Sequence, residues 1–136
     1  MINNQIILFK FIQINDNVDF FEIPYNYKLS EKFIKEFKDK VYWYYISKYQ
    51  KLSESFIREF KDKINWYHIS AFQNLSENFI REFNYEVDWS EISAYQKLSE
   101  SFIREFQDKL VWYWISQKQK LSENFMKEFK NKLYGK

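Results

Sequence analysis

Hydrophobic residues return along this chain with a period of 23 residues. Each copy begins with Leu-Ser-Glu and continues with Phe, then Ile or Met, a basic residue, Glu and a second Phe. The copies start, without insertion between them, at Leu29, Leu52, Leu75, Leu98 and Leu121. In the first copy Phe33, Phe37 and Val41 recur every four residues, which places them on one face of a helix. The pattern predicts a stack of short helical units, not a globule with a single centre.

The beginning of each copy has the features of a helix N-terminus. The Ser that follows each leading Leu can accept a hydrogen bond from a free backbone N–H, and the Glu after it lies at the positive end of the helix dipole. The Leu before this Ser and the Ile or Met four residues after the Ser have the spacing of a hydrophobic staple. We therefore predict a first helix of about eleven residues in each repeat.

A second helix begins shortly after the first. Asn65 and Asp88 are suitable N-cap residues, and Asp88 with Glu91 has the spacing of a capping box. Tyr42 and Val111, which occupy the same position in two other repeats, are poor N-caps, so those junctions should depend on packing. We predict a second helix of about eight residues that presents Trp, Ile, Ser and Gln on one face.

Neither helix is long enough to be stable on its own, because isolated helices shorter than about 12 to 15 residues are marginal in water. Neighbouring repeats must therefore pack their apolar side chains together, and burial of one Phe or Ile contributes about 1.5–3 kcal/mol. The predicted fold is all-α, an α-solenoid of short helix pairs built from 23-residue repeats.

We expect the repeats to form one continuous domain. Four full repeats occupy residues 29–120, a degenerate capping repeat precedes them in residues 1–28, and a half-repeat follows in residues 121–136. In the capping repeat Pro24 replaces the Ser of the other copies and should truncate or kink the second helix.

The half-repeat is expected to end on its first helix. Its apolar residues Phe125, Phe129 and Leu133 would then lack the second helix that covers them in other repeats. A second copy of the chain could pack on this end, so a self-associating structural protein, a homo-oligomer, is one alternative function.

Composition narrows the classes of fold and function. Gly and Pro occur once each, which argues against β-hairpins because their turns need such residues. The chain has no Cys, which fits a cytoplasmic, intracellular protein, and it has no apolar run near the length of about 20 residues that spans a bilayer. Its net charge of +2 is lower than expected of a dedicated nucleic-acid-binding domain.

One basic residue recurs in each repeat, and stacking would align these cations in a ladder. The ladder consists of Lys35, Arg58, Arg81, Arg104 and Lys127. It could follow a phosphate backbone, so nucleic-acid binding is the second alternative function. A Glu precedes each of these cations by four residues, and we expect the two to pair within the helix. A second Glu should pair in the same way with a Lys four residues later. These pairs favour a solvated, self-neutralised face.

Most variation between repeats falls on the second helix, at positions outside its repeated apolar face. The candidate protein-binding residues there are Tyr44, Tyr45, Tyr67, His68, Glu91, Tyr113 and Trp114. Tyr and Trp are frequent binding hot spots, although the same side chains could complete packing between repeats. Replacement of Tyr45, His68 and Trp114 by Ala should abolish partner binding and leave the helical circular dichroism intact. Loss of the fold would instead assign them to packing.

The third full repeat is unusually acidic. Glu82 is followed four residues later by Glu86, where other repeats have Glu and then Lys, and Asp88 and Glu91 follow. This interruption argues against a continuous phosphate groove. It fits either a contact for a basic partner or sequence drift at solvent-exposed positions.

The sequence contains no pattern typical of an active site. Ser and Gln recur on the second helix, but His68 is the only His, so no base accompanies the Ser column and structural hydrogen bonds explain it better. A lone His without Cys does not form a zinc site, and a single Gly cannot form a phosphate-binding loop. We therefore expect a protein that is not an enzyme and uses no cofactor or metal.

The repeated pattern, with its later Asp-Lys, Trp, Ile-Ser and Gln, resembles tandem repeats in proteins of large DNA viruses and some microbes. The resemblance covers residues 29–133. It implies an α-helical repeat protein of viral or phage origin, and a short binding protein of that origin would suit antagonism of a host defence factor inside the host cell. The leading hypothesis is a non-enzymatic module that binds another protein.

Overall fold

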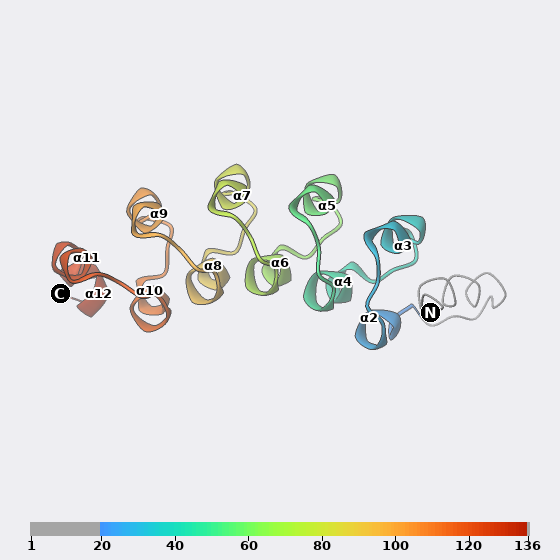
Figure 1. Ribbon diagram of the computed structural model, residues 1–136, viewed down its shortest axis with the longest axis horizontal. Helices are drawn as coiled ribbons and strands as arrows, with labels where there is room; N and C mark the ends of the chain where they lie inside the picture. The colour runs from blue at the N-terminus through green and yellow to red at the C-terminus, as the bar shows by residue number, and fades with distance from the viewer. Residues whose placement is uncertain (1–19, 136) are drawn as a thin grey trace. The chain divides into compact units, whose positions relative to one another are not determined.

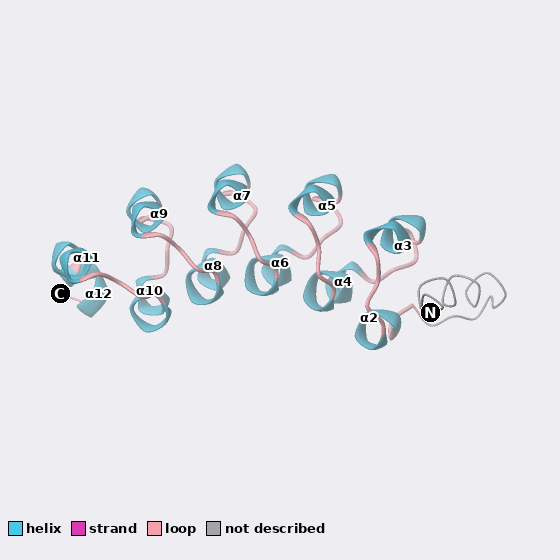
Figure 2. Ribbon diagram, viewed as in Figure 1, coloured by secondary structure: helices cyan, strands magenta, loops and turns pink. Residues whose placement is uncertain are grey.

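The computed structural model describes residues 20–135 and shows an α-solenoid of helix pairs, as predicted (Figures 1 and 2). Within these residues the chain forms helices and connecting loops and no strand. The first helices of the repeats, here called the A helices, are α3 (Glu31–Glu36), α5 (Glu54–Glu59), α7 (Glu77–Glu82), α9 (Glu100–Glu105) and α11 (Glu123–Glu128). The second helices, the B helices, are α2 (Ile23–Asn26), α4 (Trp43–Tyr49), α6 (Trp66–Phe72), α8 (Trp89–Tyr95) and α10 (Trp112–Lys118). A last helix, α12 (Lys130–Tyr134), follows α11.

The chain divides into two compact units, the first ending at Asn65 and the second beginning at Trp66. In the first unit α2 packs beside α4. In the second unit α8 packs between α6 and α10, so the B helices form one row and α7 and α9 form another (Figure 1). The arrangement as one continuous domain stays a prediction, and the part of the capping repeat before residue 20 lies outside the described residues.

Each A helix is capped as its sequence predicts. The side chain of the Ser before the helix accepts a hydrogen bond from the backbone N–H of the Phe three residues later, for example from Phe33 to Ser30 at 3.1 Å. The same bond forms at Ser53, Ser76, Ser99 and Ser122. The capping Ser in every repeat fixes where the A helix starts.

The A helices are shorter than predicted, at six residues instead of about eleven. Helix α3 ends at Phe37, where the backbone departs from helical angles (φ −106°, ψ 26°), and a single turn then carries the chain to Val41. The indole N–H of Trp43 donates to the carbonyl of Lys38 at 3.0 Å, which satisfies an oxygen freed by the break. Trp89 and Trp112 make the same bond in their repeats.

Apolar side chains from both rows of helices form the core. In the second unit Phe79, Ile80, Ile92, Phe102 and Ile103 have no exposed surface. The Trp at the start of α4, α6, α8 and α10 packs on a Phe of the next repeat, as the ring centroids of Trp89 and Phe106 show at 5.0 Å. Each ring is therefore covered by the neighbouring repeat.

The buried Ser and Gln of the B helices join neighbouring repeats. Ser93 Oγ donates to the carbonyl of Trp89 at 2.6 Å and accepts from the N–H of Val111 at 2.9 Å. Gln96 donates to the carbonyls of Ser70 and Gln73, at 2.8 and 2.7 Å, and accepts from Leu75 N–H. Ser47 and Gln50 make equivalent bonds in the first unit. These contacts confirm a structural role for the Ser and Gln columns.

The caps of the B helices also follow the sequence. Asp88 Oδ1 accepts from the N–H of Glu91 at 3.1 Å, whereas Tyr42 and Val111 make no side-chain cap bond. The predicted capping box is only half formed, because the N–H of Asp88 donates to Ser70 Oγ at 2.9 Å and not to the Glu91 side chain. Helix α2 has Pro24 in its first turn and is four residues long, where the other B helices have seven. The predicted truncation of this helix is confirmed.

The expectation of an open apolar stripe at the C-terminal end is wrong. The half-repeat does not stop after its A helix, because residues 130–134 form α12, which packs against α10. Phe125, Phe129 and Leu133 are only 0%, 8% and 9% exposed. The chain itself covers the surface that would have carried self-association.

No helix in residues 20–135 has the length and apolar character needed to cross a bilayer.

Candidate protein-binding face

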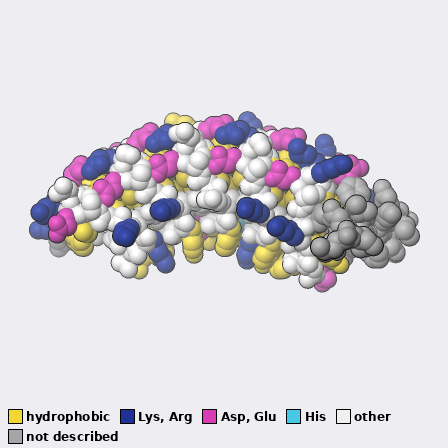
Figure 3. All heavy atoms as spheres, in the orientation of Figure 1, with side chains coloured by type: hydrophobic (Ala, Val, Ile, Leu, Met, Phe, Trp, Pro, Cys, Tyr) yellow, Lys and Arg dark blue, Asp and Glu magenta, His cyan; other side chains and the backbone are white. Residues whose placement is uncertain are grey.

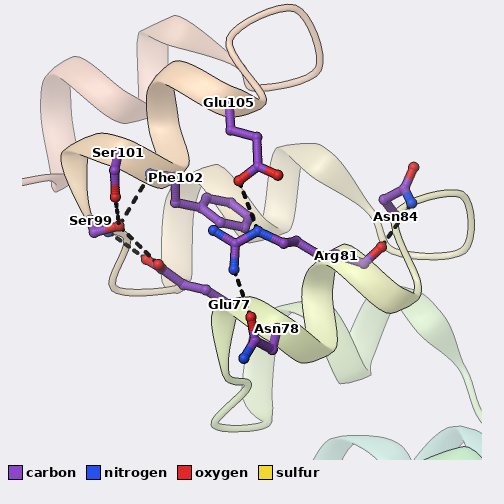
Figure 4. Close-up of polar contacts among 8 residues, drawn as sticks. All are labelled: Glu77, Asn78, Arg81, Asn84, Ser99, Ser101, Phe102 and Glu105. Carbon is purple, nitrogen blue, oxygen red and sulfur yellow. Dashed lines mark hydrogen bonds and ion pairs between the residues drawn. The ribbon is translucent and has the colours of Figure 1, made fainter.

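The outer side of the A helices, here called the A-helix edge, carries the cation ladder, and Lys35, Arg81 and Arg104 are paired between repeats. In the second unit Arg81 donates from Nε to Glu105 at 2.8 Å and from Nη1 to Asn78 at 2.8 Å (Figure 4). Its guanidinium lies 5.2 Å from the centroid of the Phe102 ring. Each partner of the pair comes from a different A helix, α7 or α9.

The same arrangement recurs on neighbouring A helices. Arg104 pairs with Glu128 at 2.9 Å and lies over the ring of Phe125, and in the first unit Lys35 pairs with Glu59 at 2.8 Å. Arg58 and Lys127 are the exposed members at the same position on α5 and α11. In the second unit acidic and basic side chains are accordingly intermingled over α7, α9 and α11 (Figure 3).

The predicted pairing within a helix is wrong for Lys35, Arg81 and Arg104, although the predicted neutralisation is seen at these three cations. The Glu at the start of α3, α7 and α9 does not pair with the cation four residues later but reaches the next repeat. Glu77 accepts from Ser99 N–H at 2.6 Å and from Ser99 Oγ at 2.8 Å (Figure 4). Glu100 holds Ser122 in the same way, and these hydrogen bonds lower the pKa of Glu100.

The second Glu column also pairs across repeats. Its members at Glu59, Glu105 and Glu128 are the partners of the ladder cations described above. Two of the Lys residues predicted to bind them instead approach an Asp of the preceding repeat, at 3.8 Å for Lys63 and Asp39 and for Lys132 and Asp108. Lys109, predicted to bind Glu105, donates to Asn84 at 2.8 Å instead.

In the first unit the B-helix edge is a cluster of aromatic rings. Tyr45 lies at its centre, with ring centroids 4.7 Å from Phe21, 5.0 Å from Tyr25 and 5.1 Å from Tyr44. Tyr25 also meets Tyr49 at 4.3 Å, and the hydrogen bond between their hydroxyls raises the pKa of Tyr25. Tyr44 is 50% exposed, whereas Tyr45 is partly buried by its neighbours.

In the second unit the B-helix edge exposes separate aromatic side chains. Tyr67 is 50% exposed and Tyr113 is 64% exposed, so both are available to a partner. Phe72 and Tyr95, which the candidate set omits, are 52% and 61% exposed, and their ring centroids lie 6.4 Å apart. The position of Phe72 and Tyr95 within the repeat carries an aromatic residue in three of the four full repeats. This recurrence could have identified the two residues from the sequence.

His68, Trp114 and Tyr45 face the interior more than their neighbours do. His68 is 4% exposed and its ring lies against Tyr67 and Phe72, and Trp114 is partly buried beside Tyr113. The sequence suggests joint replacement of these three residues by Ala as a test of partner binding. Such a variant would remove packing contacts, so Tyr44, Tyr67 and Tyr113 are the better choice for a test of binding.

Glu91 is the acidic member of the candidate set and is partly buried on α8. Partial burial and the charge of Asp88 raise the pKa of its carboxyl, and a hydrogen bond from the Tyr67 hydroxyl partly offsets them. The carboxylate in turn raises the pKa of Tyr67. In residues 20–135 no group of three or more His, Cys, Asp or Glu side chains is placed to hold a metal.

Comparisons with known proteins give no assignment. No protein-family model matches the chain, and no curated protein and no solved structure is significantly similar to it.

Proposed function

We propose that the protein is a non-enzymatic helical-repeat module that binds another protein through the exposed aromatic side chains of its B helices. The observation that carries the proposal is the row of half-exposed rings on α6, α8 and α10. It consists of Tyr67, Phe72, Tyr95 and Tyr113.

These rings combine a large contact area with a small entropic cost. A Tyr or Phe side chain has only two rotatable χ angles, so little freedom is lost when a partner covers it. The helices that carry the rings are anchored by buried side chains such as Ile69, Ile92 and Ile115, each with no exposed surface. A rigid helix with exposed aromatic side chains is a common form of protein-binding surface.

Nucleic-acid binding along the ladder is less well supported. Arg81 and Arg104 each already bind a Glu and lie over a Phe ring, so a phosphate would have to compete with these contacts. That alternative predicts an affinity that falls steeply with salt. Absence of binding to DNA or RNA at low salt would exclude it.

Two matched triple variants separate the proposals. Replacement of Tyr67, Tyr95 and Tyr113 by Ala removes the B-helix rings, and replacement of Arg81, Arg104 and Lys127 by Gln removes ladder cations. With nuclease-treated lysate of the native host, the aromatic variant should capture its partner at least tenfold less well than wild type and the ladder variant should capture it normally. The reverse result would reject protein binding through the aromatic face.

The resemblance to repeats of viral proteins supports a narrower form of the proposal, in which the partner is a host defence factor. A short chain without catalytic machinery can inhibit such a factor only by occupying its surface. Identification of the captured protein by mass spectrometry tests this point.

A further inference from the structure

Glu91 occupies a position that carries a ring in every other full repeat. The equivalent residues are Tyr45, His68 and Trp114. Those rings lie against other aromatic side chains of their own unit, whereas Glu91 places a carboxylate among rings. A partly buried carboxylate loses hydration, so this substitution is costly unless a partner group compensates for it.

The surroundings of Glu91 supply no such cation. Among the described residues Glu91 forms no ion pair, and the charge of Asp88 repels its carboxylate. Neither α6 nor α8 contains a Lys or Arg. Helix α10, which also packs against α8, has one Lys, at the position equivalent to Tyr95 and not to Glu91. The one stabilising contact is the hydrogen bond from the Tyr67 hydroxyl.

Exposed rings lie on the two helices that carry Glu91 and its partner Tyr67. Tyr95 lies one helical turn after Glu91 on α8, and its ring pairs with Phe72 of α6. Tyr67, Phe72 and Tyr95 are each at least half exposed. We call these three residues together with Glu91 the Glu91 patch. The patch offers one anionic group together with exposed aromatic rings on the neighbouring helices α6 and α8.

We propose that the Glu91 patch binds an arginine side chain of the partner protein. A guanidinium is planar, so it can donate two parallel hydrogen bonds to a carboxylate while its face lies on an aromatic ring. Lysine supplies only a point charge, and a phosphate would be repelled by Glu91. This inference rests on the proposed function and specifies which chemical group of the partner is recognised.

The test uses the full chain and three synthetic peptides that differ at one central residue between two leucines, namely arginine, lysine or citrulline. Citrulline keeps the planar shape of arginine but has no charge. Titration into the ¹⁵N-labelled protein should give saturable shifts at the amides of Tyr67, Glu91 and Tyr95. The arginine peptide should bind roughly tenfold more tightly than the citrulline peptide, with lysine between them.

Glu91→Gln should abolish the preference for arginine, whereas Glu86→Gln, at an exposed carboxylate of the same repeat, should keep it. Both variants preserve side-chain size, and their amide spectra report whether the fold is intact. Equal affinities of the arginine and citrulline peptides for the wild-type protein would overturn the inference. So would a preference for arginine that survives Glu91→Gln.

The outcome is separable from that of the proposed function. If the peptides show no arginine preference but the triple Ala variant of Tyr67, Tyr95 and Tyr113 loses its partner, protein binding stands and the arginine assignment falls. If the triple variant captures the partner normally, the proposed function itself falls.

Discussion

The A helices and the B helices of the second unit differ in whether their outer side chains are paired within the protein. On the A-helix edge Arg81 and Arg104 are held by a Glu and a Phe of the next repeat. On the B-helix edge Tyr67, Tyr95 and Tyr113 are half exposed or more, and Glu91 has no cation beside it among the described residues. A regular repeat can satisfy its own surface where residue types recur, because each copy supplies the partner of the previous one. Where residue types vary, the surface remains available to another molecule.

The largest expected effect contrasts the interior with the B-helix edge. Phe102→Ala removes a ring with no exposed surface and should lower the free energy of unfolding by about 3–5 kcal/mol. Tyr113→Ala removes a ring that is 64% exposed and should cost less than about 0.5 kcal/mol. Urea unfolding followed by circular dichroism measures both. Comparable losses would mean that the exposed ring supports the fold, and the comparison between the edges would fail.

The next effect concerns the buried polar contacts between repeats. Gln96→Ala leaves the backbone groups of Ser70, Gln73 and Leu75 without the side chain that binds them, and we expect a loss of about 2–3 kcal/mol. Gln117→Ala is the matched control, because Gln117 is exposed on α10 and should be neutral. Equal stability of the two variants in urea would contradict a joining role for Gln96.

A smaller effect is expected on the A-helix edge. Arg104→Gln removes the exposed pair with Glu128 and should lower the free energy of unfolding only slightly at low salt. Raising the salt concentration should shrink the difference, because screening already weakens the pair in the wild-type protein. A loss that is large and independent of salt would show that Arg104 acts through packing on Phe125 instead.

The smallest effects are the pH dependences of one carboxylate on each edge, which should have opposite signs. The pKa of Glu91 is raised in the folded state, so its charged form destabilises the fold, and Glu91→Gln should increase stability at pH 7 by less than about 0.5 kcal/mol. The pKa of Glu100 is lowered, so its charged form stabilises the fold and Glu100→Gln should reduce stability at pH 7.

The Glu91 difference should disappear as the pH falls to the ordinary Glu pKa of 4.5, because the carboxyl is then protonated in the folded protein and becomes protonated in the unfolded chain. The Glu100 difference should persist to lower pH and be lost only as the pH falls through the lowered pKa of the folded protein. Thermal unfolding at a series of pH values gives the measurement. Matching signs for the two variants at pH 7 would show that the two carboxylates do not differ in environment as described.

Much of the fold could be predicted because the controlling interactions are local. The Ser cap, the Asp88 cap and the truncation at Pro24 each depend on residues within a few positions of one another. The length of the A helices was predicted wrongly because it depends on contacts outside the helix. The spacing of four continues through Phe37 to Val41, but the chain turns there and the Trp43 indole takes up the freed carbonyl of Lys38.

The charge pairs were missed because they depend on the separation between stacked repeats. Arg81 and Glu105 are 24 residues apart in sequence and 2.8 Å apart in space, while a Glu four residues before Arg81 turns to Ser99. The preference for ion pairs four residues apart in a helix does not indicate whether a Glu will bind a residue of the next repeat instead. Side-chain exposure on the B helices also depends on how the repeats stack. Tyr67 and His68 are neighbours in sequence but are 50% and 4% exposed.

The sequence by itself determined the all-α repeat, its period, the starts of its helices and the apolar residues of its core, because these follow from caps and from spacing along one helix. Only the tertiary structure decided which charges neutralise one another and which aromatic side chains remain exposed on the B helices. It also decided that α12 covers the C-terminal end. The reason is physical: exposure and ion pairing at each residue depend on the repeat packed against it, and that repeat lies more than 20 residues away along the chain.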